Sequence, residues 1–199
     1  MAFLRTVLCI FALIVLASCT INSEKRLIPL SESTYPLPAR FAVVPVGGGG
    51  KPTLTVLQRK GRSYIMPVPK DDGTEIPTPV TFFKGPPRSG YLIAEVEDLG
   101  EDKSGYHYAL ARLERDVLTL YTIDNADQLA VFGELSGGRF MQGLKVDSRA
   151  NLNGAISAML ANPKTLMMEF GQLKVFDLGK PGAEAQAKRF LAEQAKLAQ

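Results

Sequence analysis

Short runs of alternating apolar and polar residues recur along the middle of the chain and predict a mostly β domain. In one such run Leu92 and Val96 share a face, whereas Glu95 lies on the other face. This period of two is typical of a strand with one buried and one solvated side. The clearest runs, joined by short polar connections, are residues 91–96, 106–113 and 117–123. Three consecutive strands of this kind predict an antiparallel meander.

Shorter runs extend the strand pattern on both sides of this meander. A turn at Lys60-Gly61 predicts a hairpin between residues 53–57 and 63–66. A last hairpin is predicted around Gly171-Gln172. The remaining strand-like runs are residues 41–44, 80–83, 129–132, 140–144, 166–170 and 173–176. From among these runs we expect an antiparallel meander of about seven to nine strands, curled into a half-barrel or a small barrel.

Two segments have helical periodicity instead. Between Ser148 and Ala161 apolar residues recur three and four positions apart, and Asp147 or Ser148 can cap the start of this helix. Residues 183–199 are rich in Ala, Glu, Gln and Lys, which favour a C-terminal surface helix. The fold class is therefore α+β and mostly β, with one amphipathic helix packed on the sheet or plugging an open end, and a C-terminal helix.

The N-terminal segment has a different character from the rest of the chain. Arg5 precedes an apolar run from Val7 to Leu16, and the small residues Ala17 and Ser18 follow it. A run of about ten residues is too short to cross a bilayer as a helix, which needs roughly 20 residues. A basic start, an apolar centre and a small-residue end are the three parts of a secretory signal.

The run Leu16-Ala17-Ser18-Cys19 resembles the lipobox of bacterial lipoproteins. The resemblance implies that residues 1–18 are a signal peptide and that Cys19 carries the lipid: a diacylglycerol on its thiol and commonly an acyl chain, such as palmitate, on its new amine. Two or three acyl chains make a durable membrane anchor, because each buried methylene contributes about 0.8 kcal/mol. Thr20 is not Asp, which in Gram-negative lipoproteins implies delivery to the outer membrane, facing the periplasm.

The chain after the anchor divides into three parts. Residues 19–38 are polar and contain several prolines, so we expect an extended, lipidated tether that holds the domain away from the membrane. Residues 39–178 form the β-rich globular domain. A Gly- and Pro-containing linker at 179–182 leads to the helix at 183–199.

The charge and cysteine content exclude several kinds of partner and cofactor. The sequence has 23 Lys and Arg against 20 Asp and Glu, without a basic cluster, so we expect no nucleic-acid partner. Cys9 belongs to the signal peptide and Cys19 to the lipid site, which leaves the domain without a disulfide or a thiolate ligand. We expect no metal and no cofactor.

No catalytic motif emerges from the sequence. His107 is the only histidine, lies in a predicted strand, and has no Gly-x-Ser-x-Gly motif to accompany it. The run Gly47–Lys51 lacks the leading Gly and the final Ser or Thr of a phosphate-binding loop. Residues 98–109 lack the side chains that a calcium loop needs. A structural histidine and two solvated loops are the simpler interpretations.

Aromatic residues on the predicted sheet are the candidates for ligand binding. If the sheet closes, some of them can line a cup for an apolar ligand, whereas the alternative is an ordinary filled β core. The four candidate ligand-binding residues are Tyr64, Tyr91, Tyr106 and Tyr108. On the C-terminal helix, Phe190 and Leu191 are the candidate partner-binding residues.

Three functions follow, in order of preference. The first is a non-enzymatic adaptor or accessory subunit, anchored in the cell envelope and bound to an envelope protein partner. The second is a periplasm-facing binding protein for a lipid or other apolar ligand, which requires an enclosed cavity of several hundred Å³. The third is an enzyme of unidentified type, which requires acidic or basic groups with shifted pKa values in a cleft.

Overall fold

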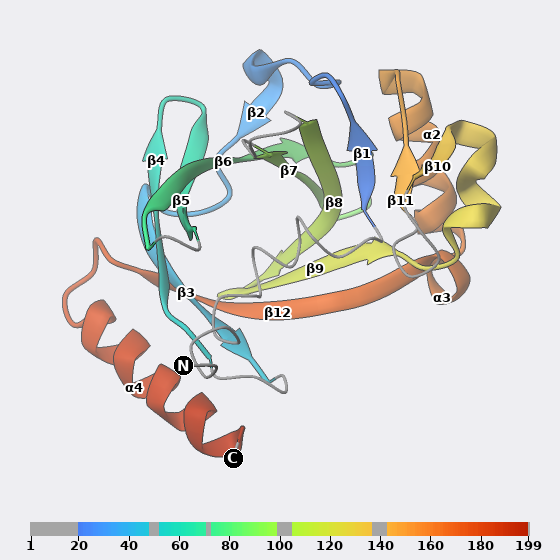
Figure 1. Cartoon of the computed structure of the whole chain (residues 1–199). Helices are drawn as coiled ribbons and strands as arrows, with labels where there is room; N and C mark the ends of the chain where they lie inside the picture. Colours follow the sequence, from blue (N-terminus) through green and yellow to red (C-terminus); the bar gives the residue numbers. More distant parts are fainter. Residues whose placement is uncertain (1–19, 48–51, 71–72, 99–104, 137–142, 199) are drawn as a thin grey trace.

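A closed antiparallel barrel of eight strands dominates the structure (Figure 1). We describe it from a computed structural model that covers residues 20–47, 52–70, 73–98, 105–136 and 143–198. Around the barrel the strands are β8 (Gly105–Glu114), β7 (Leu92–Asp98), β6 (Glu75–Lys84), β5 (Ser63–Pro69), β4 (Thr55–Lys60), β3 (Arg40–Val46), β12 (Met167–Asp177) and β9 (Val117–Ile123). Pairing of β9 with β8 closes the circle. The predicted fold class is confirmed.

The inside of the barrel is packed with apolar side chains from every strand. Tyr64 is buried there, with its ring edge-on to Phe41 at 5.3 Å and to Phe82 at 5.9 Å between ring centroids. The predicted alternation in β7 is confirmed, because Ala94 and Val96 belong to this inner cluster. The other inner residues include Leu57, Met66, Val80, Ala111, Leu118, Leu120, Leu173 and Val175.

Three short strands extend the sheet beyond the barrel from the edge of β8. They are β1 (Ile21–Ser23), β11 (Gly143–Lys145) and β10 (Glu134–Ser136), and β1 is parallel to β11. Strand β8 has two partners along this edge: residues 110–114 pair with β9, and residues 106–108 pair with β1. A further short strand, β2 (Ser33–Thr34), follows the 3-10 helix η1 (Leu30–Glu32) and pairs with β6.

Residues 20–38 are part of the folded domain, so the prediction of a free tether over 19–38 is wrong for the residues that the structure describes. Within this segment Leu27, Ile28 and Leu37 are buried. The prolines keep the chain extended, as expected, but strand pairing and apolar burial hold it on the barrel wall. The tether prediction failed because the sequence does not show that β8 leaves part of its edge open.

The predicted amphipathic helix is confirmed as α2 (Arg149–Ala161) and is followed by the short α3 (Pro163–Leu166). Ser148 caps it by accepting a hydrogen bond from the Asn151 N–H at 3.3 Å. Its apolar stripe packs on the outer face of the barrel, so α2 covers the wall and does not plug an end. The second core formed there includes Phe83, Ile93, Leu110, Ile123, Leu152, Ile156 and Met159.

The C-terminal helix is confirmed as α4 (Ala183–Leu197) and begins after Gly182, whose φ of 77° lies in the left-handed region. Its small residues Ala183 and Ala187 are buried where the helix crosses β3. A Glu184–Lys188 ion pair at 2.7 Å lies on its exposed side. Among the described helices, none is long and apolar enough to cross a membrane.

Two local strand predictions are wrong. Residues 129–132 belong to the 3-10 helix η2 (Ala126–Phe132). No hairpin forms around Gly171-Gln172, since β12 runs through as one strand with an irregularity between Glu169 and Gly171. Such a bulge lets a long strand bend while it pairs with β9 on one side and β3 on the other. Of the predicted strand at 140–144, residues 143 and 144 lie in β11, and 140–142 lie outside the described residues.

We predict that Tyr64→Phe lowers the free energy of unfolding by about 1–2 kcal/mol, because the buried Tyr64 hydroxyl donates to the Leu37 carbonyl at 2.7 Å and its removal leaves that oxygen unsatisfied. Chemical denaturation followed by circular dichroism measures the change. Tyr35→Phe, at a partly exposed position, is the control and should change stability by less than about 0.5 kcal/mol. Equal effects of the two substitutions would contradict the prediction.

Candidate functional site

A polar network fastens the N-terminal segment to the outer wall of the barrel. Arg26 follows β1 and places its Nε 2.9 Å from Glu95 Oε1 and its Nη2 3.0 Å from Glu97 Oε2. Both glutamates point outward from β7, because the residues between and before them point into the barrel. One guanidinium therefore joins two carboxylates of the same strand face, an arrangement that suits the planar donor geometry of Arg.

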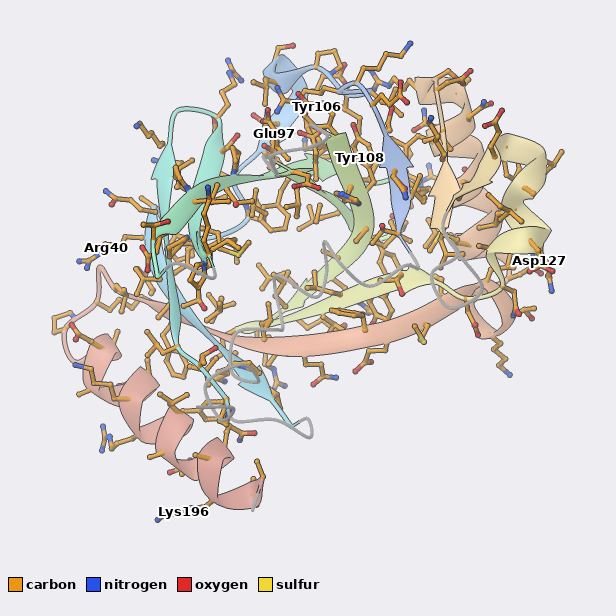
Figure 2. The ribbon with its side chains drawn as sticks, in the orientation of Figure 1. Arg40, Glu97, Tyr106, Tyr108, Asp127 and Lys196 are labelled. Carbon is orange, nitrogen blue, oxygen red and sulfur yellow. The ribbon has the colours of Figure 1, made fainter. Side chains whose placement is uncertain are left out.

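Two tyrosines of β8 complete this network. The Arg26 guanidinium lies 4.9 Å from the centre of the Tyr106 ring, within the range of a cation–π contact. The Tyr106 hydroxyl lies 3.4 Å from Glu97 Oε1, and the Tyr108 hydroxyl accepts a hydrogen bond from the Leu27 N–H at 2.8 Å. Figure 2 shows Glu97, Tyr106 and Tyr108 in one region of the barrel wall, on the adjacent strands β7 and β8. We call the set Arg26, Glu95, Glu97, Tyr106 and Tyr108 the clamp.

Glu95 is the most confined charged group of the clamp. Its side chain is 1% exposed, and its Oε2 has no hydrogen-bond partner among the described residues. Burial raises the pKa of Glu95, while the hydrogen bond and charge of Arg26 act in the opposite direction. Burial also raises the pKa of Tyr108. The geometry supports a structural role, since the carboxylate is already paired and closed off from solvent.

His107 lies on the other face of β8 and contacts the first described residue of the chain. Its Nδ1 lies 3.3 Å from Thr20 Oγ1, and its Nε2 lies 3.7 Å from Asp98 Oδ2. Burial lowers the pKa of His107, and the nearby Asp98 carboxylate opposes this. The His107 side chain is 16% exposed, and its two ring nitrogens face Thr20 and Asp98 of the domain.

The barrel interior beside His107 leaves almost no free space. The cavity there has a volume of about 10 Å³, whereas sites for small ligands usually measure about 300–1,000 Å³. Its walls are formed by Thr20, Val80, Phe82, Ala94, Val96, His107, Tyr108, Ala109 and Leu120. At this level the barrel is filled by its own side chains.

The four candidate tyrosines are not brought together. Tyr64 lies in the inner cluster, whereas Tyr108 lies in the outer core and Tyr91 and Tyr106 pack against that core. Tyr91 stacks edge-on with Tyr121 at 5.6 Å. The four therefore do not line one cup, because residues 106 and 108 fall on the outward-facing positions of β8, and ligand binding by any of them stays a prediction.

A groove of about 790 Å³ lies on the outside of the molecule. It runs between the segment around η1, the end of β6 and the exposed side of α2. At its rim Arg149 donates two hydrogen bonds to Glu32, Nη1 to Oε1 at 2.7 Å and Nη2 to Oε2 at 2.6 Å. Its lining mixes apolar and polar groups: Ile28, Glu32, Ser33, Thr34, Tyr35, Phe83, Lys84, Gly85, Pro86, Pro87, Ile93, Arg149, Asn153 and Ser157.

The candidate partner-binding residues of α4, Phe190 and Leu191, are partly buried by contacts within the chain itself. The Phe190 ring lies 5.7 Å from the ring of Phe176 on β12, and both Phe190 and Leu191 are half-buried. Leu197 near the end of the helix is 79% exposed. A second groove of about 570 Å³ lies beside the start of α4, with Pro36, Lys174 and Gln186 among its lining residues.

Arg26 and Glu95 had no place among the sequence-based candidates. Arg26 lies within the predicted tether, and the alternation over residues 91–96 predicts a solvated face for Glu95. Two acidic residues on a strand whose face is covered need a cation, but the sequence alone does not show that the face is covered. Cys19, the predicted lipid site, lies outside the described residues. Within the described ranges, no group of three His, Cys, Asp or Glu residues is placed to hold a metal ion.

The structure thus defines a closed, eight-stranded antiparallel barrel with a covering helix, a C-terminal helix and an N-terminal strand clamped to the wall. Searches of protein families, curated proteins and solved structures find no match to this chain.

We predict that Arg26→Met lowers the free energy of unfolding by about 3–5 kcal/mol near neutral pH, because it leaves the Glu95 carboxylate buried without its cation. The loss should shrink as the pH falls, since burial favours the protonated form of Glu95 and protonation removes the unpaired charge. Denaturation at pH 7 and pH 4.5 measures both effects.

Two further variants test the origin of this loss. The double variant Arg26→Met, Glu95→Gln should recover part of the stability, because the amide carries no charge. Lys145→Met removes an exposed ion pair with Glu24 and should cost far less stability than Arg26→Met, because solvent screens an exposed pair. A loss for Arg26→Met that is independent of pH and unaffected by Glu95→Gln would show that the clamp does not act through charge.

His107 should make stability fall in mild acid. Its folded-state pKa lies below the ordinary value of 6.5, so the unfolded chain binds the proton more tightly. The stabilisation by neutral His107 is present above pH 6.5 and is lost as the pH falls through the lowered pKa. We expect His107→Gln to reduce the difference in unfolding free energy between pH 7.5 and pH 5.5. An unchanged difference would assign that pH dependence to other groups.

Proposed function

We propose that this protein is a lipid-anchored lipoprotein of the bacterial cell envelope and acts as a non-enzymatic adaptor that binds a segment of another envelope protein. The lipobox-like run ending at Cys19 supports the anchor, and Thr20 in place of Asp supports the outer membrane, with the domain facing the periplasm. The domain itself then supplies a binding surface on its outside.

The close packing inside the described part of the barrel is the observation that carries this proposal. A carrier of lipids needs a large apolar cavity, whereas the barrel interior beside His107 has room for about 10 Å³. Among the described residues, the grooves of ligand-site size lie outside: one of about 790 Å³ beside α2 and one of about 570 Å³ beside the start of α4. This contrast favours the adaptor over the carrier.

The groove suits a polypeptide segment better than an acyl chain. An apolar ligand favours a mostly hydrophobic lining, but here the Glu32–Arg149 ion pair lies at the rim, and Asn153 and Ser157 present polar groups from α2. Tyr35 and the pair Pro86-Pro87 add apolar contacts. Such a mixture of aromatic, apolar and hydrogen-bonding groups is typical of protein interfaces.

The anchor is tested by the mass of the full-length protein purified from a bacterial envelope. We expect residues 1–18 to be absent and Cys19 to carry the lipid, and we expect Cys19→Ser to release the domain from the membrane fraction. An unmodified Cys19 would overturn the anchor and with it the localisation.

The adaptor role is tested by crosslinking in the envelope. A photo-reactive residue at Ser157, inside the groove, should yield a discrete protein adduct, and Arg149→Glu should abolish that adduct because it reverses the charge at the rim. The same photo-reactive residue at Gln186, exposed in the second groove, is the matched control. Native mass spectrometry of the detergent-extracted protein gives the opposing outcome: a reproducible non-covalent lipid adduct without a protein adduct would favour the carrier.

A further inference from the structure

The folded domain begins directly after the proposed lipid site. The Thr20 carbonyl accepts a hydrogen bond from the Leu144 N–H at 3.0 Å, and the Thr20 side chain contacts His107. Strand β1 begins at the next residue, Ile21. Consecutive Cα atoms are about 3.8 Å apart, so a lipid on Cys19 would be attached one residue before a segment that is held in the sheet. No described segment of chain is available as a spacer.

The start of the chain is held by more than one strand pairing. Strand β1 pairs with β8 on one side and β11 on the other, and the Val146 N–H donates to the Asn22 carbonyl at 2.8 Å. Beyond β1, Arg26 is fastened to Glu95 and Glu97. Releasing residues 20–26 as a tether would require breaking all of these interactions, including the buried ion pair.

Exposed apolar side chains lie on the elements beside this attachment point. Val131 on η2 is 82% exposed and Leu135 on β10 is 45% exposed. Leu135 pairs with Leu144, which pairs with Ile21, so one row across three strands leads from β10 to the start of β1. Helix η2 packs against both β10 and β11. Leu144 and Ile21 are themselves buried, so the exposed part of this surface consists of Val131 and Leu135, which we call the anchor face.

We propose that the barrel rests directly on the membrane surface, with the anchor face toward the bilayer and Val131 and Leu135 in the lipid headgroup region. The proposal rests on the lipidation of Cys19 and adds an orientation to the proposed function. The bilayer is the partner because acyl chains on Cys19 would bring it to the start of β1, two strand spacings of about 4.8 Å each from Leu135. Apolar side chains at such a contact add to the anchoring by burying surface at the interface.

This orientation points α4 away from the membrane. Figure 1 shows α4 on the opposite side of the barrel from β10 and β11. Figure 2 likewise places Asp127 on η2 and Lys196 on α4 at opposite ends of the molecule. Leu197 is thus a matched control for Val131: it is an apolar residue of similar exposure, 79% against 82%, on the distant side.

The test places a fluorophore on one introduced cysteine, Val131→Cys or Leu197→Cys, in the lipidated full-length protein. The protein is reconstituted in vesicles of phosphatidylethanolamine and phosphatidylglycerol that contain lipids with a quencher at headgroup depth. We expect quenching at position 131 to exceed that at position 197 several-fold. Leu135→Cys, in a second element of the anchor face, should behave like Val131→Cys and guards against a local effect of one substitution.

A linker variant isolates the spacing as the cause. Twenty Gly and Ser residues inserted between Cys19 and Thr20 span about 25 Å on average. Quenching at position 131 should then fall to the level at position 197, while the protein remains lipidated and bound to vesicles. Quenching at position 131 no greater than at position 197, in protein whose mass shows the lipid, would overturn the proposal. A protein without lipid on Cys19 would instead overturn the proposed function, and mass spectrometry distinguishes the two failures.

Discussion

The edge of β8 is the constraint on which the rest of the structure depends. Residues 110–114 of β8 close the barrel by pairing with β9. The pairing ends at residue 121 of β9, so residues 106–108 of β8 need a different partner, which is β1. Unpaired backbone groups in a buried sheet are costly, and β1 satisfies them. This single requirement draws the N-terminal segment onto the barrel, brings β11 and β10 alongside it, and creates the surface that α2 covers.

Pairing of β1 with β8 involves only three residues of the N-terminal segment. The clamp adds a second attachment through Arg26. The carboxylate of the Arg26–Glu95 pair is buried. The pair therefore stabilises the attachment mainly because moving Arg26 away would leave a buried charge without a partner, and less because of the net attraction between the two charges. The consequence is that a segment with the composition of a linker behaves as part of the core. With a lipid on Cys19, no flexible segment would separate the lipid from the barrel, and the barrel would take a defined orientation on the membrane.

A filled barrel and a hollow barrel have the same alternation of residues along their strands. They differ in how much of the interior volume their inward-facing side chains fill. Here Tyr64 contacts two phenylalanine rings inside the barrel, and its hydroxyl donates a hydrogen bond to the Leu37 carbonyl. The groove beside α2, on the outside, combines an ion pair at its rim with apolar and hydroxyl groups, and it is the basis of the proposed adaptor role.

Local patterns in the sequence were sufficient for the elements whose partners are near in the chain. The meander of β7, β8 and β9, the capped helix α2 and the C-terminal helix follow from periodicity and capping, which act over a few residues. The lipid site at Cys19 is likewise a local motif and stays a prediction. The tertiary structure decided what depends on distant partners: that residues 20–38 fold onto the wall, that β12 is one bent strand, and that Arg26 meets Glu95. It also decided that Tyr64 faces inward while Tyr106 and Tyr108 face outward, because the face a strand buries is set by the neighbours that cover it and not by its own residues.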